Sequence, residues 1–324
     1  MKKMEYPPIV QAKSLYKEFN LEAGFFVRNK KTVYAVNDVS FAIPRGSTYG
    51  LVGESGCGKS TTARMIVSMY KATKGEIVFC DKSQELRLSQ LSPNLLRRYR
   101  EQVKYIFQDP ARSLNPRMTV LQVLTAALRY SSLWQGKEDA LQRAEKIIQE
   151  VGLTVADLHR RPSEFSGGQR QRISIARGLI MEPQLLICDE VVSALDVSVQ
   201  GQILNLLQDL RQQRDLSLLF ITHDLRVACY FCDTIGVMYR GMLVEEAPAA
   251  NLYKEAAHPY TKLLFAGAQG QFTQSNSEVK SVLEEELGCP FAHRCPYVMN
   301  KCHKSIPPME EVAPGHKLRC WLEQ

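Results

Sequence analysis

The sequence contains no apolar run long enough to cross a membrane. Its longest runs are LLIC at 185–188 and LSLLFI at 216–221, whereas a transmembrane helix needs about 20 apolar residues. The first ten residues, MKKMEYPPIV, lack the apolar segment of a secretory signal peptide. We also find no internal repeat. The lack of a membrane-spanning run and of a signal peptide predicts a soluble, intracellular protein.

The composition has neither the low apolar content of a disordered chain nor the bias of a fibrous one. Apolar residues make up 45% of the 324 residues and charged residues 23%, which is ordinary globular usage. This length allows one large domain or two smaller ones, with a full core that needs no disulfide bonds. The net charge of +7 is spread along the chain. We therefore expect solvated basic faces, compatible with weak attraction to an anionic membrane surface, rather than a nucleic-acid stripe.

Strand patterns recur along the chain. Residues 8–52 are typical of strands, and a further strand at 76–80 follows the helix that a glycine-rich turn opens. Short apolar strands are expected at 185–189 and 218–222. The segment 235–246 predicts a hairpin that turns near Arg240-Gly241. Because strand and helix patterns alternate, we expect an α/β sheet.

Helical and polar segments interrupt this sheet. The pattern is helical from about 110 to 182, where one helix face is predicted to carry Leu141, Ala144, Ile148 and Val151. Ser92-Pro93 predicts an N-cap followed by a first-turn proline. The polar residues 268–281 are typical of a linker. We therefore expect a helical insertion within the sheet and a C-terminal appendage after it.

A glycine-rich segment, GESGCGKST at 53–61, fits the pattern G-x4-G-K-[ST] through Gly53, Gly58, Lys59 and Ser60. It follows an apolar strand and opens a helix, which is the context that this motif requires. The loop N–H groups, the helix N-terminus and Lys59 then bind phosphate oxygens, while Ser60 binds Mg²⁺. The alternative is a glycine-rich turn with a chance lysine. The context favours a nucleotide site.

A nucleotide site of this kind needs an acidic partner for its metal. The buried strand LLICD ends in Asp189, which would bind Mg²⁺ through water. The next residue, Glu190, would act as the general base for the attacking water. Two solvated acids at a strand end are the alternative interpretation.

Four further features mark the ends of other elements. SGGQ at 166–169 opens a helix and forms a second anion-binding N-terminus, which would serve a nucleotide held by another chain. Gln108 lies at a strand-to-helix switch, where its amide reaches both Mg²⁺ and water. Asp196, in SALD, is expected near the same interface. His223 ends a strand, where a histidine either contacts the γ-phosphate or has a structural role.

These motifs stand in the order of an ATP-binding-cassette (ABC) ATPase, over about residues 8–250. More narrowly, the chain resembles the ATP-binding subunits of oligopeptide, dipeptide and nickel importers. The likeness is carried by a cysteine-rich tail and by FQDPARSLNPRMTV (107–120), FSGGQRQRISIARGLIMEPQLLICDE (165–190) and AAHPYTKLLFA (256–266).

This resemblance implies a fold and a domain organisation. The fold is a P-loop NTPase with a RecA-like core, an antiparallel β subdomain and a helical subdomain. The nucleotide-binding domain would span 1–250, with its helical subdomain at about 110–182. The appendage typical of this family would span 251–324, where His258-Pro259 is expected to have a structural role.

The resemblance also implies residue roles. Hydrolysis would depend on Lys59, Gln108, Glu190 and His223, and Mg²⁺ on Ser60, Gln108 and Asp189. The adenine would stack on Phe19 or Tyr16. The remaining nucleotide contacts would come from Gly53, Glu54, Ser55, Gly56, Cys57, Gly58, Thr61, Ser166, Gly167, Gly168, Gln169 and Asp196.

In the family that the chain resembles, two ATPase subunits, often non-identical, lie beneath two membrane-spanning permease subunits. A binding protein delivers the cargo from outside. By resemblance, the chain is expected at the cytoplasmic face of the membrane as a peripheral subunit. ATP would close two ATPase domains head to tail, driving the permease through the region around Gln108. Hydrolysis would reopen them.

Four of the nine cysteines fall near the C-terminus: Cys289, Cys295, Cys302 and Cys320. Four thiolates suit a tetrahedral Zn²⁺ site or a [4Fe–4S] cluster, although the spacing matches no common pattern. Free structural cysteines are the alternative. The family resemblance favours a structural [4Fe–4S] cluster, because some similar subunits carry one. Cys229 and Cys232 form a C-x-x-C within an expected helix, which we interpret as packing.

Other functions are compatible with parts of the sequence. A soluble ABC ATPase acting on DNA or ribosomes usually has two cassettes or a long coiled-coil insertion, and neither is present here. The SGGQ motif and His223 argue against a P-loop kinase or GTPase. Nickel, glutathione-like peptides and oligosaccharides stay open as cargoes beside oligopeptides and dipeptides. Whether the second ATPase subunit is a copy or a paralogue also stays open.

Overall fold

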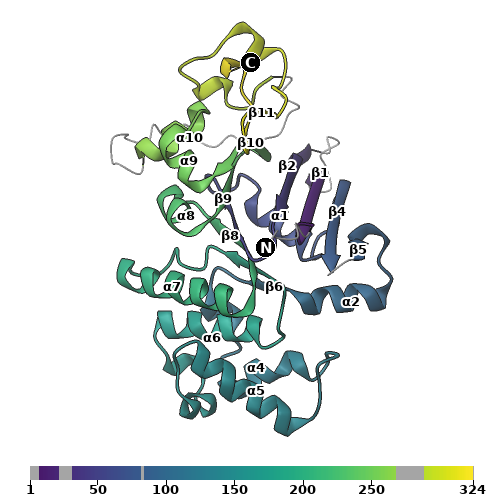
Figure 1. Ribbon diagram of the computed structural model, residues 1–324, viewed down its shortest axis with the longest axis vertical. Coiled ribbons are helices and arrows are strands. Elements are labelled where there is room, and N and C mark those ends of the chain that lie inside the picture. The colour runs from purple at the N-terminus through teal and green to yellow at the C-terminus, as the bar shows by residue number, and fades with distance from the viewer. Residues whose placement is uncertain (1–6, 22–30, 82–83, 268–287, 324) are drawn as a thin grey trace, which may run out of the picture. The chain divides into compact units, whose positions relative to one another are not determined.

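A computed structural model describes residues 7–21, 31–81, 84–267 and 288–323. The chain divides into two compact units (Figure 1). The first unit contains Ile43–Ser47 and Gln90–Ile221, with the described residues up to Ile9. The second contains Val10–Ala42, Thr48–Ser89 and the residues from Thr222 onward. Within the described ranges, no helix is both long and apolar enough to cross a membrane.

The first unit is built on a parallel sheet in the order β8-β7-β6. Its strands are β6 (Val103–Ile106), β7 (Leu185–Asp189) and β8 (Ser217–Thr222). Every residue of β7 and β8 is buried. Such continuously apolar strands are typical of a parallel sheet covered on both faces. In the register, Ile187 of β7 lies opposite Tyr105 of β6.

Helices make up the rest of the first unit, and Figure 1 shows α7, α6, α4 and α5 packed in succession. Ser92 caps α2 by accepting a hydrogen bond from the Leu95 N–H, and Pro93 is its first residue, as the sequence predicts. The helices are α2 (Pro93–Gln102), α3 (Pro110–Ser113), α4 (Val120–Leu128), α5 (Lys137–Glu150), α6 (Gly167–Leu179) and α7 (Val197–Arg214). Short 3-10 turns lie at Val155–His159 and Pro162–Glu164.

One predicted helix face needs correction. Leu141 is 37% exposed, whereas Ala144, Ile148 and Val151 are buried as predicted. The buried face of α5 begins one residue earlier, at Ala140. At 3.6 residues per turn the wider apolar stripe includes Ala140, Ala144, Ile147 and Ile148, and Leu141 lies at its edge.

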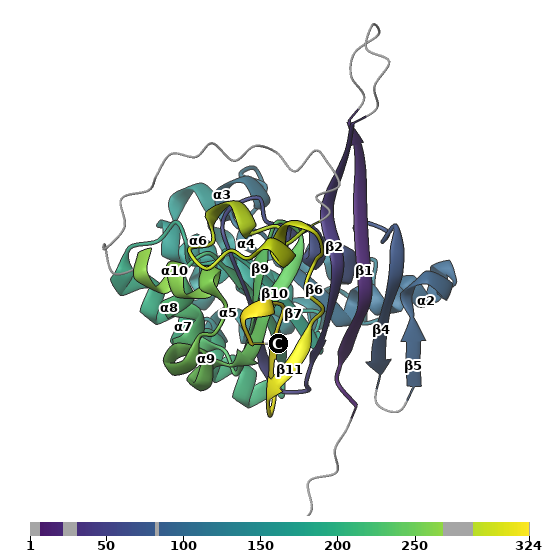
Figure 2. The same cartoon turned by 90° about the horizontal axis from the view of Figure 1, so that it is seen from above.

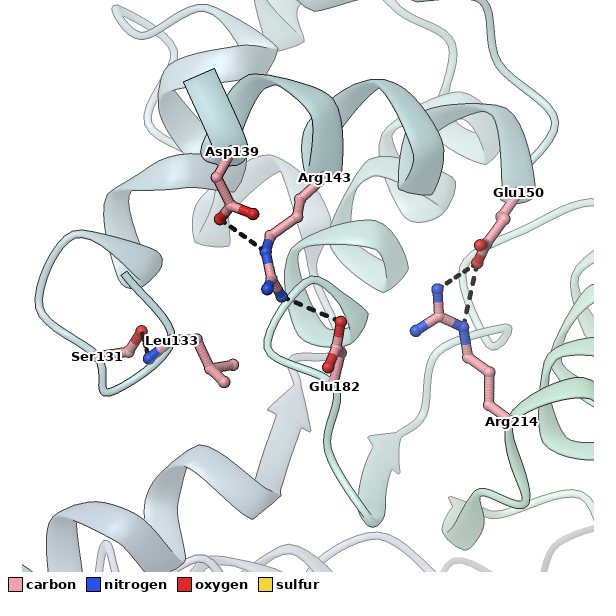
Figure 3. A network of polar contacts seen from close by, with 7 residues as sticks. All are labelled: Ser131, Leu133, Asp139, Arg143, Glu150, Glu182 and Arg214. Atoms are coloured by element: carbon pink, nitrogen blue, oxygen red, sulfur yellow. Dashed lines mark hydrogen bonds and ion pairs between the residues drawn. The ribbon is translucent and has the colours of Figure 1, made fainter. Parts of the chain in front are cut away.

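Two arginines tie α5 to its neighbours in the first unit (Figure 3). Arg143 donates hydrogen bonds to Asp139 at 2.8 Å and to Glu182, just beyond α6, at 3.0 Å. Arg214, the last residue of α7, donates two hydrogen bonds to Glu150 at the end of α5. Side chains at both ends of α5 therefore fix its position against α6 and α7.

The second unit contains a four-stranded sheet in the order β2-β1-β4-β5 (Figure 2). β1 pairs antiparallel with β4, with a register shift between Lys13 and Tyr16, and β4 pairs antiparallel with β5. The strands are β1 (Val10–Leu21), β2 (Lys31–Ile43), β4 (Lys74–Asp81) and β5 (Gln84–Arg87), followed by a 3-10 turn at Leu88–Gln90.

A second set of strands in this unit has the order β11-β12-β10-β9-β3. β3 and β9 are parallel, and β9 forms the predicted hairpin with β10, turning at Arg240 and Gly241. Antiparallel and parallel pairs therefore occur in one mixed sheet. Its strands are β3 (Thr48–Val52), β9 (Thr234–Tyr239), β10 (Met242–Pro248), β11 (Glu310–Ala313) and β12 (His316–Leu318).

The helices of the second unit are short. They are α1 (Lys59–Ile66), α8 (Leu225–Phe231), α9 (Ala249–Glu255) and α10 (Pro259–Gly267). After residue 288 the chain forms 3-10 turns at Ala292–Arg294, Asn300–His303 and Trp321–Glu323. The predicted linker at 268–281 lies outside the described residues.

Candidate functional site

The glycine-rich segment of the second unit has the predicted strand–loop–helix context. β3 ends at Val52, and α1 begins at Lys59. Gly53 and Gly58 have positive φ angles, and a Cβ on either would lie within 2.3 Å of a backbone oxygen, that of Met238 or Ala35. Only glycine fits such positions. The loop packs directly on β2 and β9 because both residues lack a side chain.

Lys59 turns back over this loop. Its Nζ donates hydrogen bonds to the backbone oxygens of Gly53, at 2.7 Å, and Glu54, at 2.9 Å. The residue is 4% exposed. Burial raises the pKa of the neighbouring Cys57 thiol, although the Lys59 charge acts to lower it. The ammonium group is thus held at the loop where the sequence predicts phosphate binding, while Ser55 and Gly56 form its exposed tip.

Other parts of the second unit anchor the same loop. The N–H of Gly241, in the β9–β10 turn, donates to the Cys57 oxygen at 2.9 Å. The Tyr260 hydroxyl of α10 accepts from the Glu54 N–H at 2.9 Å, and Arg294 pairs with the Glu54 carboxylate. The sequence analysis did not identify Tyr260 or Arg294 as loop contacts. No local signal marks them, because they lie more than 200 positions away in the chain.

The acidic pair lies at the end of β7 in the first unit. Asp189 is 4% exposed and accepts a hydrogen bond from the Tyr105 hydroxyl. Glu190 has a φ of 50°, in the left-handed region that is strained for a side chain of this kind. Its N–H donates to the Ile221 oxygen at 3.0 Å, which extends the pairing of β7 with β8. The sequence analysis missed Tyr105; the available signal was its hydroxyl in a strand whose other buried residues, Val103 and Ile106, are apolar.

Gln108 meets this acidic pair. Its Nε2 donates a hydrogen bond of 2.7 Å to Oε2 of Glu190. The residue follows β6, and the next residue, Asp109, caps α3 by accepting from the Ala111 and Arg112 N–H groups. Two polar residues that the sequence places 82 positions apart are therefore in contact.

The SGGQ segment opens α6, as predicted. Ser166 is the N-cap and forms a reciprocal capping box with Gln169, which satisfies two backbone N–H groups. A Cβ on Gly168 would lie 2.6 Å from the Val199 side chain, so this glycine permits close packing against α7. Ser166 and Asp196, the latter at the start of α7, are both exposed.

Two further predicted contact residues, His223 and Phe19, lie in the second unit, together with His258, for which a structural role is predicted. His223 is exposed, directly before the N-cap Asp224 of α8. The Phe19 ring lies edge-on to Tyr70 at 5.6 Å, beneath the Lys17 ammonium. His258 is 1% exposed, and its Nδ1 accepts from the Tyr260 N–H at 3.0 Å. Burial lowers the pKa of His258 to about 4, so the residue is neutral at physiological pH.

The four C-terminal cysteines all lie in the second unit. Among the residues that the structure describes, no three Cys, His, Asp or Glu side chains form a group that could hold a metal ion. The pKa of the Cys289 thiol is raised to about 11, mainly by burial and to a smaller extent by the charges of Cys302, Cys320 and Cys295. The four thiols therefore influence one another without a closed ligand set. Of the C-x-x-C pair, Cys232 is buried, as the packing interpretation predicts, whereas Cys229 is only partly buried.

Comparison with known proteins identifies the family. The ABC transporter profile matches residues 36–193, and that of the oligopeptide/dipeptide transporter C-terminal region matches 244–302. The chain is 40% identical to the oligopeptide transport ATP-binding protein AppF of Bacillus subtilis, over 97% of each chain. It belongs to the ABC ATPases of the oligopeptide/dipeptide transporter family. This ABC ATPase is also 48% identical to OppF of the same organism, over 74% of this chain and 78% of that one.

Solved structures support the ABC ATPase fold. A dimeric ABC cassette, MJ0796, in a post-hydrolysis state bound to ADP and Pi, has a TM-score of 0.63 and 27% identity, and the match covers 74% of this chain and 98% of the other. The cassette cbiO1 of Clostridium perfringens, at 24% identity and a TM-score of 0.65, shares the fold. This ABC ATPase therefore has the P-loop fold that the sequence predicts, with mixed α/β sheets.

Proposed function

We propose that this ABC ATPase hydrolyses ATP to drive import of oligopeptides or dipeptides through a membrane transporter. The cargo class is supported by the similarity to AppF, an oligopeptide transport ATP-binding protein. The match to the transporter C-terminal region at 244–302 supports it as well. The observation that carries the ATPase function is the contact of Gln108 with Glu190 beside the buried Asp189. Nickel, glutathione-like peptides and oligosaccharides are the alternative cargoes.

The chemistry is assigned to the predicted motif residues. The phosphate loop from Gly53 to Thr61 binds the phosphates of ATP, and Lys59 exchanges its backbone acceptors for phosphate oxygens. Ser60, Gln108 and Asp189 would hold Mg²⁺, which would neutralise phosphate charge when bound. Glu190 accepts the proton of the attacking water, and His223 contacts the γ-phosphate. Adenine stacks on Phe19.

A second ATPase subunit completes each site. Ser166, Gly167, Gly168, Gln169 and Asp196 lie at the N-termini of α6 and α7, and Ser166 and Asp196 are exposed. A helix N-terminus presents N–H groups to an anion. We assign these residues to the nucleotide that the opposite subunit holds, by analogy with the dimeric cassette MJ0796. The second subunit is expected to be a paralogue.

The remaining partners are two permease subunits and an extracytoplasmic binding protein, with the ATPase peripheral at the cytoplasmic membrane face. To test this assembly, tagged Glu190→Gln protein is purified with ATP from detergent-solubilised membranes of its native host. Two multi-span proteins and a second ATPase subunit should co-purify. The double variant Lys59→Ala, Glu190→Gln, which lacks the phosphate-binding lysine, should retain less of the second ATPase. Ribosomal or DNA-bound material without membrane subunits would contradict the transport function and favour a soluble ABC ATPase.

The C-terminal appendage, 251–324, is proposed to hold a structural [4Fe–4S] cluster on Cys289, Cys295, Cys302 and Cys320. The chemical type of the ligands fits such a cluster, because four cysteine thiolates ligate it. The thiols do not form a closed site in the structure, because no three candidate ligands in the described ranges form a group that could hold a metal ion. Anaerobically purified protein should contain iron and acid-labile sulfide, both absent from a variant with the four cysteines changed to serine. Stoichiometric zinc without iron would contradict the cluster and indicate a zinc site instead.

A further inference from the structure

Glu54 places a negatively charged carboxylate within a loop that is proposed to bind phosphate. The residue lies between Gly53 and the exposed loop tip, and its side chain is 38% exposed. Lys59 binds its backbone oxygen and not its carboxylate. A carboxylate within several ångströms of a triphosphate repels it, and partial burial strengthens that repulsion because water screens it less. The loop therefore needs a cation for Glu54 that is separate from Lys59.

Arg294 supplies this cation from the far end of the sequence. Its Nη1 and Nη2 donate hydrogen bonds of 2.9 and 3.0 Å to the two carboxylate oxygens of Glu54. Such a bidentate pair fixes orientation as well as charge. A guanidinium stays protonated over the whole physiological pH range, so the pair keeps its charge. Only 28% of the Arg294 side chain is exposed.

Aromatic rings hold Arg294 in this position. The guanidinium carbon lies 5.9 Å from the Tyr239 ring centre and 5.8 Å from that of Phe291. Tyr239, Tyr260 and Phe291 contact one another, with ring centres 4.6 to 5.5 Å apart, and all three are buried. They come from β9, α10 and the turn before Arg294. Arg294 is therefore supported by a packed aromatic cluster of Tyr239, Tyr260 and Phe291, and it does not lie on a free surface loop.

The same aromatic cluster also binds the backbone of Glu54, through Tyr260. The Tyr260 hydroxyl accepts from the Glu54 N–H, and Lys59 donates to the Glu54 oxygen. Both backbone polar groups and both carboxylate oxygens of Glu54 therefore have partners. Movement of the carboxylate away from Arg294 would disturb the bond that orients Lys59.

We propose that Arg294 is a positioning residue for ATP binding: it neutralises Glu54 and holds the phosphate loop open to the anionic triphosphate. The inference rests on the proposed function, because it presumes that the loop binds ATP. Arg294 acts through Glu54 and does not touch the nucleotide. The C-terminal residues thereby contribute to nucleotide affinity through Glu54.

The test measures ATP affinity of the purified full-length protein by fluorescence titration with N-methylanthraniloyl-ATP and Mg²⁺. Arg294→Gln should weaken binding by roughly tenfold, because it leaves a carboxylate facing phosphate. Arg294→Lys, which keeps the charge but not the paired donors, should be intermediate. Lys304→Gln is the matched control: it removes an exposed cation from the same C-terminal segment and should bind like the unaltered protein.

The double variant Glu54→Gln, Arg294→Gln separates charge neutralisation from general damage. It should recover affinity to within about threefold of the unaltered protein, since the unfavourable carboxylate is gone. Where steady-state hydrolysis is measured, Arg294→Gln should raise KM for ATP with little change in kcat. A double variant as weak as Arg294→Gln would overturn the proposal, as would an Arg294→Gln protein with unaltered affinity.

Failure of the proposed function has a different signature. In that case the unaltered protein would not bind the ATP analogue, and Lys59→Ala would change nothing. Binding by the unaltered protein that Lys59→Ala abolishes, combined with no effect of Arg294→Gln, would reject only the role of Arg294. Melting temperatures of all variants, measured in parallel, separate altered affinity from unfolding.

Discussion

The amide of Gln108 donates a 2.7 Å hydrogen bond to the carboxylate of Glu190. The two residues follow adjacent parallel strands, β6 and β7, whose carboxyl ends meet at one edge of the sheet. Glu190 is held at a positive φ, with its N–H bound to Ile221. The contact fixes the carboxylate that we assign as general base and joins it to the residue assigned to sense Mg²⁺ and the γ-phosphate.

Replacing Glu190 by Gln should preserve ATP binding and slow hydrolysis by at least about 100-fold. The amide has nearly the same shape, but it cannot accept the proton of the attacking water. Phosphate release and analogue binding, measured on the same preparation, check both parts. Unchanged hydrolysis would remove the general-base role. Gln108→Ala, which frees the carboxylate but leaves it ionisable, should slow hydrolysis less.

Lys59→Ala should weaken ATP binding by about 100-fold or more, because a buried cation at the phosphate loop is lost. Its Nζ donates to three loop atoms, the backbone oxygens of Gly53 and Glu54 and the Cys57 sulfur. An alanine at the exposed Lys71 of the same unit is the charge-matched control. Equilibrium titration with an ATP analogue gives the comparison. Full binding by Lys59→Ala would contradict the phosphate-site assignment.

Two glycines of the loop should respond differently to alanine. At Gly58 the new Cβ would lie 2.3 Å from the Ala35 oxygen, so the loop or β2 must move, and we expect both ATP binding and stability to be lost. At Gly56 a Cβ meets no described atom within 4 Å, and only its positive φ is unfavourable. That strain costs about 1–3 kcal/mol. Thermal melting and ATP titration of both variants test the contrast; equal losses would contradict it.

Stability should be greatest near pH 6.5. Burial lowers the pKa of His258 to about 4, so between about pH 4 and 6.5 only the unfolded chain binds this proton, and stability falls as pH falls. A hydrogen bond to Glu245 raises the pKa of His316. Its stabilisation is complete below about pH 6.5 and is lost as pH rises through the raised pKa.

Glu245 contributes on the acid side. Burial acts to raise its pKa, but hydrogen bonds from His316 and two backbone N–H groups lower it overall, so its stabilisation is lost as pH falls through that lowered pKa. Lys262 and Glu255 are the other charges that act on these histidines. Melting temperatures from pH 4 to 9 test the profile. His316→Gln should flatten the alkaline side only; an unchanged alkaline slope would exclude His316 as its cause.

Local sequence accounted for features whose atoms lie close together in the chain. The phosphate loop follows from Gly53 to Ser60, because backbone conformation and helix start are both set within nine residues. The capping box of Ser166 and Gln169 and the hairpin at Arg240-Gly241 are local in the same way. Hydrophobic periodicity located α5 but did not show that Leu141 lies at the exposed edge of its face, since periodicity does not show how wide the covered stripe is.

Residue type and order along the chain were thus enough to predict an ABC ATPase and the residues of its motifs. Contacts between distant segments required the folded chain: Tyr105 with Asp189, Gln108 with Glu190, and Arg294 with Glu54 across 240 positions. A side chain carries no mark of its long-range partner, because that partner is set by strand order and by the packing of apolar faces. For the same reason, the sequence predicts that four cysteines could serve as ligands, but the distances between their thiols depend on how residues 288–323 fold.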